Sequence, residues 1–119
     1  MASVLITAVA LPHNQAGYNL TDSADFSTLV AGAGNGVRFA WTDSLLVVLK
    51  NDTAGAAVFT LKLPVPAAIS AYGGTITNPT NSVAAAKTEL MRLDSQFRDA
   101  NAEVTIECDV AAKVLVLSL

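Results

Sequence analysis

The stretch that determines the fold of this chain runs from Val37 to Leu63 and reads VRFAWTDSLLVVLKNDTAGAAVFTLKL. Apolar side chains alternate with polar or small ones at its start and again at its end, which is typical of strands with one buried face. The run LLVVL at residues 45–49 has no polar residue, which favours a central strand buried on both faces. The polar residues from Asn51 onward predict a tight hairpin turn, closed by Gly55 at positive φ, that folds the strands on either side against each other.

Further strand patterns lie on both sides of this stretch. Val4 to Leu11 and Phe26 to Val30 are short apolar segments before it, and Ala102 to Cys108 and Val114 to Leu119 follow near the end of the chain. Two prolines end the strand at residue 63, so residues 64–82 are expected to form a long loop and a candidate contact surface. Residues 83–93 fit a helix by propensity and a strand by alternation.

These patterns predict a single all-β domain over residues 1–119. Six to eight short strands and at most one short helix indicate an antiparallel β-sandwich of the jelly-roll kind. The length is sufficient to bury a core without disulfides or metals, and the single Cys108 excludes an intramolecular disulfide. Because residues 1–17 contain no Asp, Glu, Lys or Arg, we expect them to form an extended arm that pairs with the strand edge of another subunit.

The composition limits the classes of partner. Only 14% of residues are charged whereas 52% are apolar, so we expect a partner to cover part of the surface. A net charge of −3 and scattered basic residues argue against nucleic acid. Prolines and glycines interrupt the uncharged span of residues 63–86, which excludes a membrane helix there. The N-terminus lacks the basic region of a signal peptide, so synthesis in the cytoplasm is expected.

Three features invite a chemical interpretation. The glycine-rich run at residues 32–36, GAGNG, is similar to a phosphate-binding loop, but a strand pattern follows it where a helix is required. His13 has no Cys, Asp or Glu at ligand spacing, so no metal site or catalytic role is expected for it. Cys108 shares a strand face with Val104 and Ile106, which favours a buried core position over a nucleophile.

Carboxylates and aromatics suggest two sugar-related functions. Glu103, Glu107 and Asp109 share one strand face with Thr105, and adjacent positions on such a face are about 7 Å apart, within the range of about 6.5 to 9.5 Å for inverting glycosidases. Any solvated acidic strand has this spacing, so no catalytic residues are assigned. Tyr18, Trp41 and Tyr72 suit a carbohydrate-binding module, although Trp41 is in phase with Val37 and Phe39 and is therefore expected in the core. We expect no enzymatic activity, cofactor or metal.

The order of elements carries a resemblance to a known group of proteins. A glycine-rich lead-in precedes LVVLKN at Leu46 to Asn51, a small-residue turn and a Thr-containing strand follow, and FRDAN at Phe97 to Asn101 precedes the closing VLVLSL. This order resembles that of small tailed-phage and prophage head decoration, or cement, proteins. The resemblance implies a β-sandwich, with residues 83–93 as a strand, that binds the assembled phage head and stabilises it.

The same resemblance implies partners and a location. The partners would be the major capsid protein and neighbouring copies of the chain, without nucleic acid or membrane. The protein would be made in the host cytoplasm and lie on the outer capsid surface of the virion. Two alternatives stay open: a head-completion or tail-associated structural protein, and a carbohydrate-binding β-sandwich module.

Overall fold

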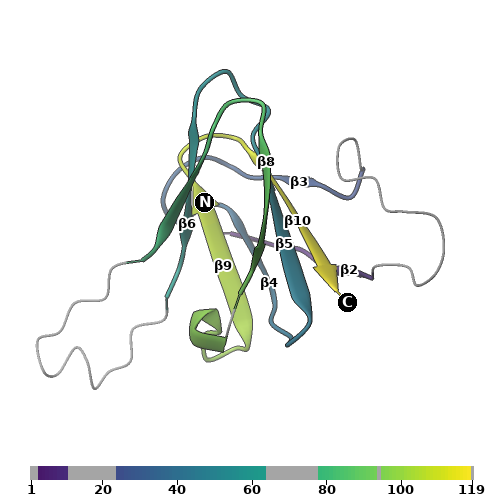
Figure 1. The fold of residues 1–119 in the computed structure, drawn as a ribbon. Coiled ribbons are helices and arrows are strands. Elements are labelled where there is room, and N and C mark those ends of the chain that lie inside the picture. Colours follow the sequence, from purple (N-terminus) through teal and green to yellow (C-terminus); the bar gives the residue numbers. More distant parts are fainter. Residues whose placement is uncertain (1–2, 11–23, 64–77, 94, 119) are drawn as a thin grey trace, which may run out of the picture.

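The computed structural model describes residues 3–10, 24–63, 78–93 and 95–118, and it confirms the all-β sandwich (Figure 1). Sheet A contains, in spatial order, β1 (Val4–Leu5), β4 (Val37–Ala40), β9 (Glu103–Cys108), β6 (Ala57–Leu61) and β7 (Thr80–Val83). Sheet B contains β2 (Val9–Ala10), β10 (Lys113–Ser118), β5 (Leu45–Lys50) and β8 (Thr88–Arg92), and β3 (Ser27–Thr28) also pairs with β10. A single 3₁₀ turn, η1 (Ser95–Phe97), is the helical part of the described chain.

The strands are more numerous and less uniform than the sequence predicts. The described residues form ten strands, where six to eight were expected, because the N-terminal region contributes three two-residue pieces. Two of these pieces pair in parallel, β1 with β4 and β2 with β10, whereas the other pairings are antiparallel. The sheets are therefore mixed at the edges that the N-terminal segment occupies.

The predicted hairpin between β5 and β6 is wrong, although both strands exist. β5 pairs with β8 and β10 in sheet B, whereas β6 pairs with β7 and β9 in sheet A. Residues 51–56 therefore form an arch between sheets. Six residues can extend to about 20 Å, which exceeds the distance of about 10 Å between stacked sheets. Gly55 is also not at positive φ, since the described glycines with positive φ are Gly32, Gly34 and Gly36.

The buried side chain of Asn51 holds this arch. Its Nδ2 donates hydrogen bonds to the carbonyl oxygens of Gly55, at 2.8 Å, and Val83, at 2.9 Å. Its Oδ1 accepts from the backbone N–H of Thr53 at 2.9 Å and from the Thr53 hydroxyl at 2.6 Å. Its backbone N–H donates to Lys87 O at 3.0 Å. The amide is thus satisfied on every side and joins the arch to the end of β7 and the start of β8.

A second arch corrects the interpretation of residues 83–93. The strand expected there begins at Thr88, and Val83 is instead the end of β7 in the other sheet. Residues 84–87 connect the two sheets, with Ala86 at a φ of 61°. Among the described strands, β6 and β7 are the pair of consecutive strands that hydrogen-bond to each other. Of the predicted 64–82 loop, residues 64–77 lie outside the described residues, and residues 80–82 belong to β7.

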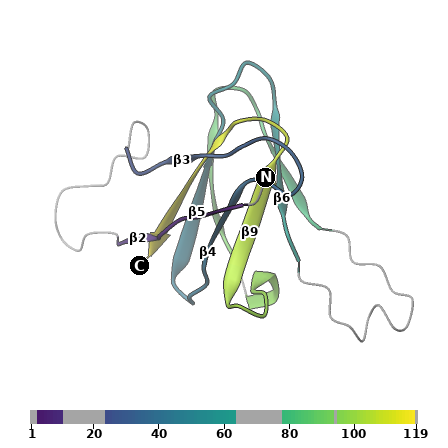
Figure 2. The ribbon, with the colours of Figure 1, turned by 180° about the vertical axis from the view of Figure 1, so that it is seen from behind.

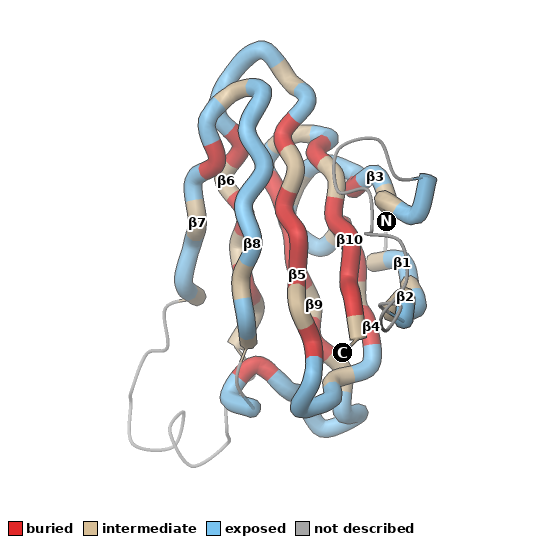
Figure 3. Tube along the Cα trace, turned by 45° about the vertical axis from the view of Figure 1, so that its right-hand side comes forward, coloured by how far each residue is buried: buried red, intermediate tan, exposed pale blue. Residues whose placement is uncertain are grey.

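The core lies between the sheets and extends to the outer face of sheet B. One cluster joins both sheets and includes Phe39, Val47, Phe59 and Ile106, all fully buried. A second cluster of Val48, Leu115 and Leu117 lies on the other face of sheet B, under Val9 and Phe26. β5 is therefore buried on both faces, as its uninterrupted apolar run predicts. Figure 3 shows this buried centre along β5 and β10.

The two sides of the sandwich differ. On one side, the N-terminal segment covers both sheet edges, since β1 lies along β4 and β2 lies along the end of β10. Figure 2 shows β2 close to the C-terminus. On the other side, β7 and β8 are the outermost strands of sheets A and B and are largely exposed (Figure 3). A hydrogen bond of 3.0 Å from Asn81 Nδ2 to Glu89 Oε1 joins the sheets there.

We predict that Phe39→Ala destabilises the fold by about 3 to 5 kcal/mol, because it leaves a cavity in the shared core. Arg38→Ala should cost about 1 kcal/mol or less, since its ion pair with Glu103, at 3.3 Å, is solvent-exposed in part. Urea unfolding monitored by Trp41 fluorescence measures both values. Equal costs would show that the register of β4 is assigned incorrectly.

We predict that Asn51→Ala costs at least about 2 kcal/mol, because the carbonyl of Val83 loses its buried donor. Thr53→Ala, which removes only one partner of the same amide, should cost about 1 kcal/mol or less. Thermal unfolding of both variants tests the difference. An Asn51→Ala variant as stable as Thr53→Ala would exclude the amide as the element that holds the arch.

Candidate functional site

The glycine-rich loop folds back over β9. All three of its glycines have positive φ, at 108° for Gly32, 83° for Gly34 and 108° for Gly36. The backbone N–H of Gly32 donates to Cys108 O at 2.9 Å. At Gly36, a Cβ would lie 2.3 Å from the carbonyl oxygen of Ile106. Only glycine permits both the conformation and this close approach.

A carboxylate of the chain itself occupies the loop. The N–H of Gly34 donates to Glu107 Oε2 at 2.8 Å, and Lys62 Nζ lies 3.8 Å from Glu107 Oε1. Glu107 is buried, with 8% of its surface exposed. The backbone donor that a phosphate-binding loop would direct at its ligand is thus directed at an internal anion. This contact joins residues 73 positions apart, which no local pattern in the sequence indicates.

A shallow cavity of about 320 Å³ lies beside this loop. Its lining consists of Gly32, Ala33, Val58, Thr60, Glu107, Cys108 and Asp109. Cys108 is buried in the shared core, as predicted, and burial raises the pKa of its thiol. A raised pKa favours the neutral thiol, which is typical of a buried core cysteine and not of a thiolate nucleophile.

The three carboxylates of the acidic strand face each have a separate structural partner. Glu103 pairs with Arg38, and Glu107 binds the glycine-rich loop. Asp109 Oδ1 accepts from the N–H of Val58 at 2.9 Å. These three carboxylates therefore connect β9 and the residue after it to β4, to the glycine-rich loop and to β6. The glycosidase hypothesis gains no support from their arrangement.

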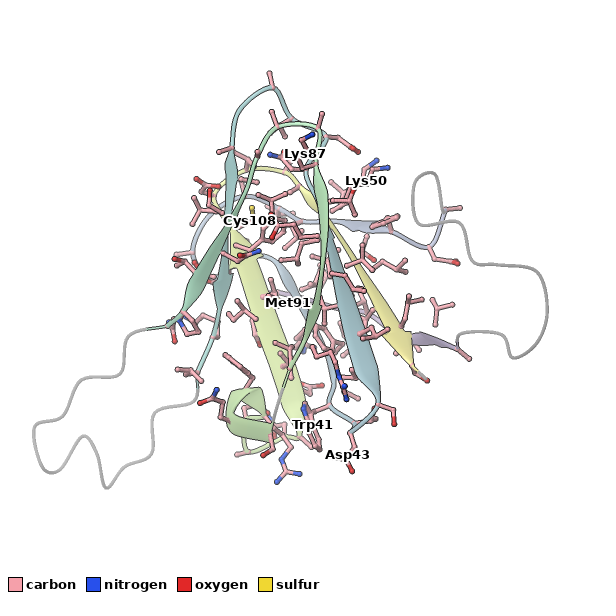
Figure 4. The ribbon with its side chains drawn as sticks, viewed as in Figure 1. Trp41, Asp43, Lys50, Lys87, Met91 and Cys108 are labelled. Carbon is pink, nitrogen blue, oxygen red and sulfur yellow. The ribbon has the colours of Figure 1, made fainter. Side chains whose placement is uncertain are left out.

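The aromatic residues do not form a platform within the described part of the chain. Trp41 is half-buried, packs against the shared core, and lies under the guanidinium of Arg98 at 5.3 Å from the ring centre. Its Nε1 is buried without a hydrogen-bond partner. Figure 4 places Trp41 at the end of the sandwich away from Lys50 and Lys87. His13, Tyr18 and Tyr72 lie outside the described residues.

Charged side chains near the first arch contact one another. Asp52 lies between two lysines, with Oδ2 2.9 Å from Lys113 Nζ and Oδ1 3.8 Å from Lys50 Nζ. The hydrogen bond from Lys113 lowers the pKa of the Asp52 carboxyl below its ordinary value. The Lys50 ammonium also lies 5.2 Å from the centre of the Phe26 ring. These basic groups therefore face internal partners.

A second cavity, which we call the N-terminal groove, lies beneath the segment that connects β1 to β2. Its volume is about 360 Å³, and its lining consists of Leu5, Ile6, Thr7, Ala8, Ala40, Thr42, Glu103 and Ser118. Main-chain bonds hold the segment there, including Val4 N to Gly36 O at 3.0 Å and Ile6 N to Arg38 O at 2.8 Å. Val4 and Leu5 nevertheless remain 53% and 55% exposed. The groove was not predicted, because its walls come from four separate strand regions.

We predict that Gly36→Ala destabilises the fold by about 2 kcal/mol or more, because the new Cβ would collide with backbone at a positive φ. Gly34→Ala meets open space and should cost only about 1 kcal/mol, from its φ alone. Gly55→Val should change stability by about 0.5 kcal/mol or less, since Gly55 has ordinary φ and open space. Thermal unfolding of the three variants tests this order, and a costly Gly55→Val would contradict it.

The described residues contain no group of three or more His, Cys, Asp or Glu side chains arranged to hold a metal ion. Within the same residues, no helix is long and apolar enough to cross a membrane. No protein-family model, curated protein or solved structure matches this chain.

Proposed function

We propose that this chain is a structural virion protein, a decoration or cement protein that binds the assembled head of a tailed phage and stabilises it. The observation that carries the proposal is the N-terminal groove with its exposed rim. Val4 and Leu5 belong to a paired strand, yet each residue is more than half exposed to solvent. An extended segment of this kind suits binding by main-chain pairing and apolar contact.

The charges around the groove support a contact that does not depend on ion pairs. Glu103 in the groove wall is paired with Arg38, and the Nη1 of Arg38 also donates to Ser3 O at 3.1 Å. The remaining lining is apolar or uncharged. The contact with the major capsid protein is therefore expected to persist at high salt, because apolar contacts are screened much less than exposed ion pairs.

Binding of this kind stabilises a shell through mass action. A protein that binds the assembled lattice, and not free capsid subunits, shifts the equilibrium towards the lattice. The gain at each site is modest, but it repeats at every equivalent site on the outer surface. A small domain with an apolar contact region is sufficient for such binding to the lattice.

The alternative of a head-completion or tail-associated protein uses the same surfaces. It differs in copy number and position, since a cement protein covers the shell and a connector occupies one vertex. Counting copies per particle by quantitative gel analysis of purified virions distinguishes the two. No feature of the described residues favours the carbohydrate-binding alternative, because Trp41 lies under Arg98.

We predict that Leu5→Lys abolishes binding to capsid shells and leaves the fold intact, because it places a charge at the exposed rim of the groove. The shells are assembled from the major capsid protein of the phage or prophage that carries this chain. Co-sedimentation in about 1 M salt, where the Debye length is about 3 Å, removes weak ionic binding. The wild-type chain should co-sediment and the variant should remain in solution.

Val30→Lys is the matched control, because Val30 is also exposed, at 41%, but does not line the groove. It should bind as the wild type does. If Leu5→Lys also binds fully, the contact lies elsewhere, for example in residues 64–82 or on a sheet face. Failure of all three proteins to bind shells would reject the decoration function.

A further inference from the structure

β8 is the outermost described strand of sheet B. One edge of this strand pairs with β5, and no described strand pairs with the other. Four of its five residues are exposed, and only Met91 is partly buried. Natural edge strands commonly carry a proline, a bulge or charged side chains that discourage pairing with another chain. β8 has the charged residues Glu89 and Arg92 but no proline, and its central residue, Leu90, is 56% exposed.

The hydrogen-bond pattern identifies which backbone groups face this edge. The bond from Asn51 N to Lys87 O extends the β5–β8 register by one hydrogen-bonded pair. Such pairs alternate with non-bonded pairs along an antiparallel ladder. The backbones of Glu89 and Met91 therefore bond to β5. The N–H and C=O groups of Thr88, Leu90 and Arg92 point away from the sheet.

The side chain of Leu90 is the exposed end of an apolar row. Leu90 is opposite Val48 on β5, and Val48 is opposite Leu115 on β10. Val48 and Leu115 are almost fully buried, with exposures of 0% and 1%. The row thus continues the outer core of sheet B to Leu90, beyond which sheet B has no further described strand.

We propose that β8 is a self-association edge, at which two copies of the chain pair β8 with β8 in antiparallel orientation about a two-fold axis at Leu90. Leu90 then faces Leu90 of the second copy, and Thr88 faces Arg92 of the second copy. The outward backbone groups coincide in this register, so each of these opposed pairs exchanges two hydrogen bonds. Sheet B becomes continuous across both copies.

The sequence of β8 favours a second copy as the occupant. In this register Glu89 faces Met91 and Arg92 faces Thr88, so no like charges are directly opposed. The two Leu90 side chains join the apolar rows of both copies. The edge of sheet A on the same side offers only small polar side chains at its exposed positions, Thr80 and Ser82. β8 is therefore the edge that gains apolar contact on pairing.

The interface is small, so the isolated dimer is expected to be weak and concentration-dependent. The inference does not rest on capsid binding, and it is tested with the purified chain alone. If the chain also binds a shell, the high local concentration there would increase pairing without any new contact.

Disulfide trapping tests the register. Hydrogen-bonded residues on antiparallel strands have Cα atoms about 5.5 Å apart, within the range for a disulfide. Leu90→Cys should therefore form a covalent dimer on mild oxidation. Thr88→Cys alone should not, because its two copies would lie about 13 Å apart along the strands. A mixture of Thr88→Cys and Arg92→Cys should cross-link. The wild type controls for Cys108, which is buried.

Equal cross-linking of Thr88→Cys alone and of the mixture would indicate random collision and overturn the register. Sedimentation velocity over a concentration series then tests the interface without cross-linking. The wild type should dimerise with rising concentration. Leu90→Lys should raise the dissociation constant at least about tenfold, because it places two ammonium groups opposite each other. The matched Val30→Lys, which lies outside β8, should behave as the wild type.

A wild-type chain that stays monomeric at every concentration, or a Leu90→Lys variant that dimerises equally well, would overturn the proposal. A Leu90→Cys variant that forms no covalent dimer on mild oxidation would also overturn it. Thermal unfolding of each variant establishes that a loss of pairing is not a loss of fold.

Discussion

The buried amide of Asn51 is the interaction on which the alignment of the two sheets most depends. An amide that is removed from water is costly unless its donors and acceptor are satisfied. Here the donors bind carbonyl oxygens of Gly55 and Val83, and the acceptor binds Thr53. Because Val83 ends β7 in sheet A and the Asn51 backbone also bonds Lys87 next to β8 in sheet B, one residue fixes two crossings between the sheets.

This constraint explains which parts of the fold the sequence could predict. Alternation and the apolar run at residues 45–49 located β4, β5, β6 and β9 correctly, because burial on one or two faces is a local property. Pairing is not local. The residues from Asn51 to Gly55 would suit a hairpin turn or an arch equally, and the difference lies in whether the Asn51 side chain faces solvent or the ends of two other strands. The latter depends on residues 83 and 87, far along the chain.

The glycine-rich loop shows the same limit for the candidate site. The strand pattern after this loop correctly predicted β4, and a strand there argues against a phosphate-binding loop because that motif requires a helix. The reason for its glycines is nonetheless a distant contact, because Gly36 lies against the Ile106 carbonyl and Gly34 donates to Glu107. The sequence pattern predicted a positive φ for Gly55 instead, but the φ of Gly55 is ordinary. The sequence shows where glycine is present, but only the groups that pack against each glycine in the fold show where glycine is required.

The unequal sides of the sandwich connect the two proposals. On one side the N-terminal segment occupies the edges of both sheets and leaves Val4 and Leu5 exposed, whereas on the other side no described strand pairs with the outer edge of β8. The two contact regions therefore do not compete for the same surface, and one copy can use both at once. Each region is small, and its central exposed side chain, Leu5 or Leu90, is apolar and adds no long-range electrostatic attraction. Two weak contacts become effective together when partners are held at high local concentration, as on a regular lattice. A chain of this kind would bind an assembled surface much more strongly than it binds any single partner in solution.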